Sequence, residues 1–375
     1  MAPEPGLRVA LVSPYDLSRP GGVQGQVRGL AAALVAAGHA AVVLAPDDRR
    51  PGWVPGGPAE EYAVGRAVAL PANGSMAPVS LSPAAALRAR RAAAAWRADV
   101  VHLHEPLAPL VGYGFLASRR WPVVATFHRA GGGGAYGLAA PLGRWATRRV
   151  RVRCAVSEVA RETASAICGG TYDVLFNGVD LARFRRDRPA PAGPPAVLFL
   201  GRHERRKGLE VLLEAFRSVA PPAELWIAGV GPETDRLRAA HPGTERVRWL
   251  GQLSDEEVTE RLLRATALCA PSLGGESFGI VLLEGMAAGC SVVASDIAGY
   301  RAAAGGHAAL VPPGDAAALG AALTRVLSDA PDPGALAAAI AHAQAWSLDR
   351  LAARYVDLYR RALGAPAGGG TIVRR

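Results

Sequence analysis

Two glutamates, Glu276 and Glu284, lie eight residues apart in the segment GGESFGIVLLE, residues 274–284. The apolar run Ala267–Ala270 before this segment predicts a buried strand, and the pattern after the glycines predicts a helix. Backbone N–H groups at the start of a helix bind anions, so residues 278–281 are candidates for holding a phosphate. Because Glu284 lies about one turn into the helix, both carboxylates can face one ligand and bind sugar and ribose hydroxyls. The alternative, that the pair only stabilises the helix start, accounts for Glu276 but not for Glu284.

A basic turn follows a second apolar run. The turn, residues 201–208 (GRHERRKG), comes directly after the predicted strand Val197–Leu200 and contains Arg202 and Lys207. Lys207 is the single lysine among 42 basic residues, which favours a site that needs a compact ammonium group. Two cations at the carboxyl end of a sheet would neutralise a departing diphosphate. The alternative is a solvated basic turn without a ligand.

A glycine-rich turn also follows the first predicted strand. This turn, residues 20–24 (PGGVQ), lies between the apolar run Arg8–Ser13 and the predicted helix Gln24–Ala37. At the start of a helix, Gly22 would allow a phosphate to approach its N–H group. The alternative is that the glycines serve only the tight turn itself.

Metal ligands are not indicated by the sequence. His102 and His104 lie on one face of a predicted strand, and we expect them to pack and hydrogen-bond rather than to bind a metal. No Asp-x-Asp pair occurs in the chain, so the usual ligands of a metal-bridged diphosphate are missing. We therefore expect no tightly bound cofactor, with Mg²⁺ at most a stimulating ion.

The elements that must position these residues alternate between strand and helix. In the first half, strands are expected at residues 8–13, 41–45, 100–103, 123–126, 155–156 and 174–176. In the second half they are expected at 197–200, 225–228, 247–250, 267–270 and 291–294, and the last helix is expected at 348–363. This alternation predicts an α/β protein with two parallel, doubly wound, Rossmann-like halves. The proline-rich stretch 185–195 is the expected linker.

The bulk composition agrees with two soluble domains. A chain of 375 residues exceeds the usual size of one core, and the net charge of +10 indicates an acidic partner such as a nucleotide, nucleic acid or anionic lipid. A non-enzymatic nucleic-acid-binding protein is one alternative, but zinc-finger spacing is missing and only 6% of residues are aromatic. The four dispersed cysteines favour a reducing cytosol, and neither a signal peptide nor a membrane-spanning run is indicated.

Together, these motifs resemble family 4 glycosyltransferases of the GT-B fold. The resemblance rests on Glu-x7-Glu after Gly-Gly, on Gly-Arg-x4-Lys-Gly, on PGGVQ and on NGVD at 177–180, and it extends from Arg8 to about Leu363. Within that family the chain is most similar to the actinobacterial phosphatidylinositol α-mannosyltransferases. The similarity is carried by SPY at 13–15, NGS at 73–75, HLHEP at 102–106, TFH at 126–128 and LGGESFGIVLLEGMAAG at 273–289.

The resemblance implies a retaining transferase that takes mannose from GDP-mannose, held in a central cleft between two Rossmann-like domains. The expected domains are residues 1–177 plus 346–375, on the acceptor and membrane side, and residues 178–345, which bind the nucleotide sugar; the C-terminal helix crosses back to the first domain. The acceptor would be the inositol ring of phosphatidylinositol. The protein would be cytoplasmic and peripheral on the inner face of the cell membrane.

The resemblance also assigns roles to individual residues. The expected catalytic residues are His128, Arg202, Lys207 and Glu276. The expected donor-binding residues are Gly22, Arg202, Lys207, Leu253, Asp255, Glu276, Phe278, Gly279, Ile280, Val281 and Glu284. The expected acceptor-binding residues are Tyr15, Gln24, Asn73 and Ser75. Arg88, Arg90 and Arg91 would meet anionic lipid, and the alternative for them is an ordinary solvated helix face.

Three positions depart from the pattern of the lipid mannosyltransferases. Pro78 and Ser80 stand where arginines for the inositol phosphate are expected, and Val258 stands where a lysine near the guanine is expected. A family 4 transferase with another sugar nucleotide and a soluble acceptor, such as a polyol or a glycan, is therefore the alternative. The four glycines at 131–134, just after His128, would form either an acceptor lid or a slack surface loop.

Overall fold

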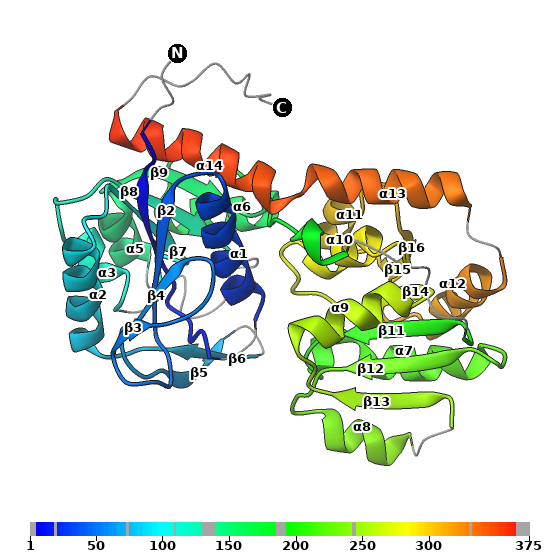
Figure 1. The fold of residues 1–375 in the computed structure, drawn as a ribbon. Coiled ribbons are helices and arrows are strands. Elements are labelled where there is room, and N and C mark those ends of the chain that lie inside the picture. Colours follow the sequence, from blue (N-terminus) through cyan, green and yellow to red (C-terminus); the bar gives the residue numbers. More distant parts are fainter. Residues whose placement is uncertain are drawn as a thin grey trace. The chain divides into compact units, whose positions relative to one another are not determined.

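The computed structural model describes residues 5–18, 21–72, 75–108, 110–129, 140–184, 193–241, 245–329 and 332–364. The chain divides into two compact units, Met1–Gly178 with Leu348–Arg375 and Val179–Ser347 (Figure 1). These boundaries lie one and two residues from the predicted ones at 177/178 and 345/346. The stretch 185–195, which was expected to link the domains, falls inside the second unit. Residues 185–192 of it lie outside the described part of the chain.

The first unit is built on an eight-stranded sheet with the order β10-β9-β8-β7-β1-β2-β4-β3, in which only the β3–β4 pair is antiparallel. Its strands are β1 (Arg8–Val12), β2 (Ala40–Ala45), β3 (Gly52–Val54), β4 (Glu60–Ala63), β7 (Val100–His104), β8 (Val123–Phe127), β9 (Val150–Ala155) and β10 (Asp173–Val174). A separate antiparallel pair consists of β5 (Val68–Ala72) and β6 (Ser75–Val79). The apolar central strands β7 and β8 are buried along their whole length, which explains why the sequence predicted them.

The bounds of two predicted strands of this sheet were wrong, and β3 and β4 were not predicted. β9 covers Val150–Ala155 rather than residues 155–156, and β10 covers Asp173–Val174 rather than residues 174–176. Arginines alternate with apolar residues in β9, so the segment lacks the apolar run of a buried strand. The arginines nevertheless have structural partners, because Arg151 donates to the carbonyl of Ala362 at 2.7 Å and Arg153 donates to that of Gly169 at 2.7 Å.

Six helices are described in the first unit, and the last of them returns from the far end of the chain. They are α1 (Gly22–Ala36), α2 (Pro83–Ala95), α3 (Tyr113–Leu116), α5 (Ala140–Thr147), α6 (Glu158–Cys168) and α14 (Leu348–Leu363). The predicted return of the C-terminal helix to the first domain is thus confirmed. Gly29 of α1 makes room for it, since a Cβ at that position would lie 2.6 Å from Cδ1 of Leu348.

The second unit is a six-stranded, wholly parallel sheet with the order β13-β12-β11-β14-β15-β16. Its strands are β11 (Ala196–Leu200), β12 (Glu224–Ala228), β13 (Val247–Gly251), β14 (Ala267–Ala270), β15 (Ser291–Ser295) and β16 (Ala309–Val311). Its helices are α7 (Leu209–Ala215), α8 (Thr234–Ala240), α9 (Asp255–Arg264), α10 (Ile280–Ala287), α11 (Ala298–Ala304), α12 (Ala316–Ser328) and α13 (Pro333–Ala345), and short 3₁₀ turns occur at 181–184, 205–207 and 216–218. Since all strands are parallel, the loops that leave them meet at one edge of the sheet.

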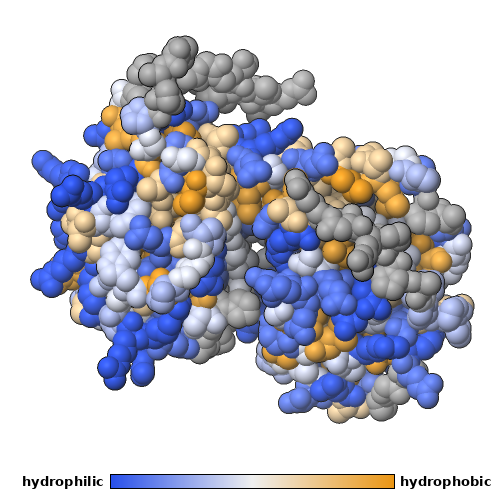
Figure 2. Space-filling model, in the orientation of Figure 1, coloured by the Kyte–Doolittle hydropathy of each residue, from blue (hydrophilic) through white to orange (hydrophobic). Residues whose placement is uncertain are grey.

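Hydrophilic residues cover much of the surface in view in Figure 2, and hydrophobic residues lie between them in separate groups. None of the helices in the described part of the chain is both long and apolar enough to cross a lipid bilayer.

Candidate active site

A cluster of charged side chains in the second unit joins the two loops that the sequence singled out. The Lys207 Nζ lies 2.7 Å from Oε1 of Glu276, and Nη1 of Arg206 lies 2.5 Å from the same oxygen. Lys207 and Glu276 therefore come together as predicted from the chemistry of their loops. The side chain of Lys207 is 21% exposed and that of Glu276 is 14% exposed, so the pair is shielded but still reachable by a ligand.

Arg206, which the sequence did not single out, extends this cluster. Its Nε donates to Oε2 of Glu204 at 2.9 Å, and the other Glu204 oxygen lies 3.2 Å from Nη1 of Arg202. Glu204 is 3% exposed as a side chain, whereas Arg202 is 48% exposed. Cations and carboxylates thus alternate from Arg202 through Glu204, Arg206 and Glu276 to Lys207. Such alternation fixes the direction of each charged group and lowers the cost of partly burying it.

The backbone between β11 and α7 is packed directly against the loop after β14. Gly208 has a φ of +69°, and a Cβ at this position would lie 1.9 Å from the carbonyl oxygen of Pro271. Nearby, the N–H of Leu273 donates to the carbonyl of Arg206 at 2.7 Å. Because no side chain fits at position 208, the glycine is what allows the loop of Lys207 to approach the loop of Glu276.

The start of α10 packs against Tyr300 of α11. Gly279 precedes the helix at a φ of +99°, and a Cβ there would lie 2.4 Å from the ring of Tyr300, whose hydroxyl is hydrogen-bonded to that of Ser272 at 2.8 Å. Phe278 is 3% exposed and packs on Trp346 with a ring-centroid distance of 4.9 Å. Phe278 can therefore contribute only its backbone to donor binding. Ile280 and Val281 are partly exposed in the first turn of the helix.

Glu284, one turn into α10, lies beside residues predicted to bind the nucleoside. Its Oε1 is 3.9 Å from Nη1 of Arg183, and its side chain is 20% exposed. Arg183 also donates to the carbonyl of Asp255 at 2.9 Å and to the hydroxyl of Thr259 at 3.0 Å. The guanidinium therefore joins the expected ribose-binding carboxylate to the start of α9. Leu253, just before α9, is partly exposed, and Asp255 is exposed.

Burial raises the pKa of Glu284 to about 7, while the positive charge of Arg183 lowers it and the charge of Asp255 raises it. A glutamate in the unfolded chain titrates near pH ~4.3, so the folded protein retains this proton over the interval between the two values. We therefore expect the folded state to lose stability as the pH rises from about 4 to about 7, and to lose less in Glu284→Gln. Thermal unfolding midpoints across this range measure the difference.

Glu214→Gln is the matched control, because Glu214 is an exposed glutamate on α7 of the same unit. It should show the pH dependence of the wild type. If Glu284→Gln also kept that pH dependence unchanged, the carboxyl of Glu284 would not be the group that titrates.

The first unit contains the predicted donor residue Gly22 and the four predicted acceptor residues. Gly22 is exposed at the first position of α1, and open space surrounds the position of a Cβ there. Gln24 is buried, and its Nε2 donates to the carbonyl of Asp16 at 3.2 Å, so its amide braces the loop after β1. Tyr15 is half-buried and pairs with Val79 by a β-bridge. Asn73 lies outside the described residues, as does the side chain of Ser75.

His128 directly follows β8 and is half-buried. Its Nε2 lies 3.0 Å from Nδ1 of His104, the last residue of β7. Burial lowers the pKa of His128 to about 4, so the imidazole is neutral at pH 7. His128, Gly22 and Tyr15 belong to the first unit, whereas the Lys207–Glu276 pair belongs to the second.

His102 and His104, both in β7, are buried and hydrogen-bonded. His102 is fully buried, and its two ring nitrogens lie 2.8 Å from the hydroxyls of Tyr359 and Thr126. Tyr355 is hydrogen-bonded to the same threonine at 2.8 Å, so two tyrosines of α14 close a polar network within the core. Both ring nitrogens of His102 are thereby hydrogen-bonded. Among the residues that the structure describes, no group of three or more His, Cys, Asp or Glu side chains could hold a metal ion.

The three arginines expected to meet lipid have different surroundings on α2. Arg88 donates through Nε to the carbonyl of Val64 at 2.6 Å, and Arg90 is partly buried with an Nε that has no hydrogen-bond partner in the described structure. Arg91 is exposed. The contact of these arginines with lipid stays a prediction, and Arg91 is the most exposed of the three. Arg91 and the 46% exposed Leu87 lie one turn apart on the outer face.

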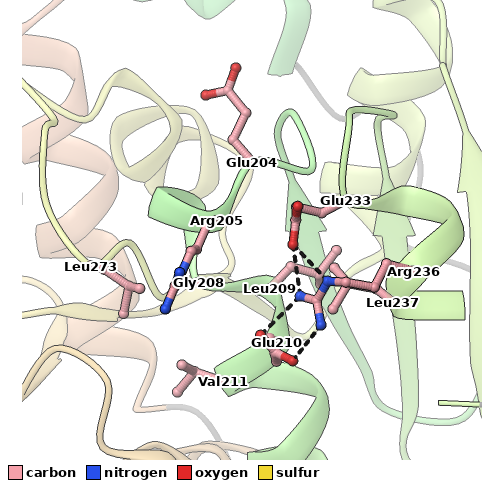
Figure 3. Close-up of a pocket in the computed structure, with 10 residues that line it drawn as sticks. All are labelled: Glu204, Arg205, Gly208, Leu209, Glu210, Val211, Glu233, Arg236, Leu237 and Leu273. Atoms are coloured by element: carbon pink, nitrogen blue, oxygen red, sulfur yellow. Dashed lines mark hydrogen bonds and ion pairs between the residues drawn. The ribbon is translucent and has the colours of Figure 1, made fainter. Parts of the chain in front are cut away.

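A pocket on the second unit lies next to the cluster of Arg206, Lys207 and Glu276, but none of these three side chains lines it (Figure 3). It is lined by Glu204, Arg205, Gly208, Leu209, Glu210, Val211, Glu233, Arg236, Leu237 and Leu273. Arg236 is bound to Glu210 at 2.9 Å and to Glu233 at 2.7 Å, and Figure 3 shows the carboxylate of Glu204 pointing away from them. Because carboxylates already surround this cation, the pocket offers little attraction for a phosphate.

Comparison with known proteins identifies the class of fold and site. The family described as Glycosyltransferase Family 4 matches residues 20–183, and the family described as Glycosyl transferases group 1 matches residues 194–329. Sucrose-phosphate synthase of Thermosynechococcus elongatus superposes with a TM-score of 0.77 at 23% identity, covering 96% of this chain and 100% of that one. HepE of Anabaena, in complex with UDP-glucose, superposes with a TM-score of 0.72 at 17% identity, covering 95% and 100%. The fold is GT-B, the two-unit architecture of nucleotide-sugar-dependent glycosyltransferases.

Sequence relatives define the family more closely. The phosphatidyl-myo-inositol mannosyltransferase of Mycolicibacterium smegmatis is 38% identical over 341 residues, which cover 86% of this chain and 85% of that protein. The protein of the same name from Mycobacterium leprae is 39% identical over 340 residues, covering 86% and 87%. The chain belongs to the family 4 glycosyltransferases and is an enzyme of that class. These matches favour the transferase over a nucleic-acid-binding protein.

Proposed function

We propose that the protein transfers mannose from GDP-mannose to the inositol ring of phosphatidylinositol, with retention of the anomeric configuration. The observation that carries the proposal is the Lys207–Glu276 pair, at 2.7 Å, beside the start of α10. It combines a compact cation for a diphosphate with a carboxylate for sugar hydroxyls. The similarity to phosphatidyl-myo-inositol mannosyltransferases over most of both chains supports the choice of sugar and acceptor.

In the proposed reaction, the bond between the anomeric carbon and the diphosphate oxygen breaks as the inositol hydroxyl attacks from the same face. The hydroxyl proton passes to the departing phosphate oxygen, so the products are mannosylated lipid and GDP. Arg202 and Lys207 stabilise the charge on the leaving diphosphate, and Glu276 orients the mannose. Asp255 and Glu284 hold the nucleoside, and His128 contacts the sugar near the point of transfer. Chelation of divalent cations should leave the reaction measurable.

The protein is proposed to act as a cytoplasmic, peripheral enzyme at the inner face of the cell membrane. The acceptor is a lipid, and the exposed Leu87 and Arg91 on α2 offer an apolar and a cationic side chain one turn apart. Such a pair suits the boundary between headgroups and acyl chains of an anionic bilayer. The lipid contact assigned to α2 therefore rests on Arg91 and Leu87, since Arg88 donates to a carbonyl within its own unit.

A second candidate function is transfer from another sugar nucleotide to a soluble acceptor. Two residues expected near the acceptor favour this second function. Ser80 is fully buried, and the carbonyl of Pro78 accepts the N–H of Asp16 at 3.0 Å. Neither position presents a cation to an inositol phosphate. Val258 lies on α9, where a lysine would be expected to meet guanine.

The deciding experiment incubates purified protein with phosphatidylinositol vesicles and radiolabelled GDP-mannose, and follows the label by lipid extraction. Label in a product that migrates as mannosylated phosphatidylinositol, with an α-anomeric proton by NMR, is the expected result. Parallel reactions contain UDP-glucose and UDP-N-acetylglucosamine. Label in a water-soluble glycoside, or turnover with a uridine donor alone, would replace the proposed function by the second candidate.

A further inference from the structure

Glu105 has an unusual conformation at the end of β7. Its φ is +49°, a left-handed backbone that residues other than glycine rarely adopt, and only 5% of its surface is exposed. Its N–H donates to the carbonyl of Thr126 at 2.8 Å, which continues the pairing of β7 with β8 beyond the last strand residue. A buried, non-glycine residue remains in this region only when its surroundings hold it there. Hydrogen bonds to the side chain of Glu105 hold the residue in this conformation.

The Glu105 carboxylate accepts hydrogen bonds from the backbone directly after β8. A single oxygen, Oε2, accepts the N–H of His128 at 3.0 Å and the N–H of Arg129 at 3.1 Å. Hydrogen bonds to an ionised oxygen are about twice as strong as neutral ones, so this contact fixes the chain at His128 firmly. Burial and the charge of Glu105 both raise the pKa of Tyr15, which places this carboxylate within electrostatic range of a predicted acceptor residue.

The ring of His128 is held by a second residue, His104. The Nδ1 of His104 lies 3.0 Å from the Nε2 of His128, so one of these nitrogens donates a proton and the other accepts it. The remaining nitrogen of His104, Nε2, is buried and has no hydrogen-bond partner in the described structure. Burying an unpaired N–H is less favourable than burying an unpaired acceptor. The proton of His104 therefore belongs on Nδ1, and His104 donates to His128.

The direction of this hydrogen bond determines the state of His128. Because its Nε2 accepts a proton from His104, a neutral His128 carries its own proton on Nδ1. The ring of His104 is itself fixed by the ring of His102 at a centroid distance of 4.2 Å, and His102 is bound to Tyr359 and Thr126. The buried residues His102 and His104 thus determine the tautomer of His128.

We infer that His104 and Glu105 are positioning residues that present His128 to the sugar as a neutral Nδ1–H donor, with Glu105 fixing its backbone and His104 its tautomer. This inference rests on the proposed function, in which His128 contacts the sugar at the point of transfer. It assigns His128 the role of a hydrogen-bond donor rather than a base. A donor agrees with a reaction in which the leaving phosphate, not a protein group, takes the acceptor's proton.

The kinetic test compares His104→Asn with His104→Leu. The asparagine amide N–H occupies nearly the place of the Nδ1–H of histidine, whereas leucine fills similar space without a donor. We expect His104→Leu to lower kcat about tenfold or more, because small misplacements of a reacting group cost up to about a hundredfold. His104→Asn should recover most of that loss, and KM for the donor should stay nearly constant in both. Equal losses in the two variants would show a packing role and overturn the inference.

The corresponding test of the carboxylate compares Glu105→Gln with Glu105→Ala. Glutamine keeps an oxygen that can accept the N–H groups of His128 and Arg129, and alanine does not. Glu105→Ala should lose kcat about as strongly as His104→Leu, and Glu105→Gln should retain clearly more of it. Unchanged kcat in Glu105→Ala, while the wild type is active, would contradict the inference.

A readout without catalysis separates this inference from the proposed function. In the full-length protein labelled with ¹⁵N-histidine, ring spectra at pH 7 should show His128 protonated on Nδ1, with the signal assigned by its loss in His128→Gln. His104→Leu should move that signal toward a mixture of tautomers. A wild-type His128 protonated on Nε2 would overturn the inference whatever the activity. If the wild type mannosylates no phosphatidylinositol, the proposed function fails, and the spectra still decide the tautomer.

Discussion

Replacing Lys207 by alanine is expected to lower the rate of sugar transfer about a hundredfold or more, because removing one group that stabilises developing charge costs about 3 to 4 kcal/mol. The ammonium is held 2.7 Å from Glu276 and is 21% exposed, so its position is defined and it remains open to a diphosphate. Steady-state kinetics with a saturating donor measure the change in kcat. Arg202→Ala is expected to act in the same direction.

The control for this prediction is Arg205→Ala. Arg205 lies in the same 3₁₀ turn, two residues before Lys207, and is exposed. Its removal takes away one positive charge from the turn without touching the pair with Glu276, so the transfer rate should change little. Lys207→Arg should remain impaired, because a planar guanidinium does not replace a compact ammonium. Equal rates in Lys207→Ala and Arg205→Ala would mean that only the general charge of the turn matters.

Gly208→Ala is expected to disrupt the second unit and to abolish binding of the nucleotide. A left-handed backbone costs a residue other than glycine about 1 to 3 kcal/mol, and the new Cβ would also lie 1.9 Å from the carbonyl oxygen of Pro271. The loops of Lys207 and Glu276 would have to separate to relieve this overlap. Urea unfolding and calorimetric titration with GDP measure the two effects.

Gly289→Ala distinguishes steric overlap from backbone strain. Gly289 follows α10 with a φ of +80°, and open space surrounds the position of a Cβ there. This variant should therefore lose only the conformational part, about 1 to 3 kcal/mol, and should still bind GDP. A loss of stability in Gly208→Ala no larger than in Gly289→Ala would show that the two loops can move apart easily.

The sequence predicted that the Lys207 loop and the Glu276 loop lie close together, because local patterns determine where these loops stand. In both the Lys207 loop and the Glu276 loop, an apolar strand is followed by glycines and then a helix, and parallel strands bring such loops to one edge of a sheet. The last helix was predicted at residues 348–363 and is found there, since its apolar positions repeat with a helical period. These features require no knowledge of distant contacts.

The partners of these residues could not be predicted in the same way. Arg206 bridges Glu204 and Glu276, and Arg183 reaches Glu284 from a turn about 100 residues earlier in the chain. In a chain with 42 basic residues, neither arginine differs locally from its many neighbours. Among the strands that the sequence did predict, β9 and β10 have the largest errors, and they are likewise set by tertiary contacts rather than by apolar runs.

The return of α14 to the first unit affects the order in which the two units can complete their folding during synthesis. Tyr355 and Tyr359, which are 2% and 0% exposed, complete the polar network around His102 and Thr126. The ribosome synthesises all of residues 179–347 before these tyrosines, so the second unit can fold while the first still lacks part of its core. The first unit to be translated is the last to be completed, and its core must stay protected from aggregation until the final helix emerges.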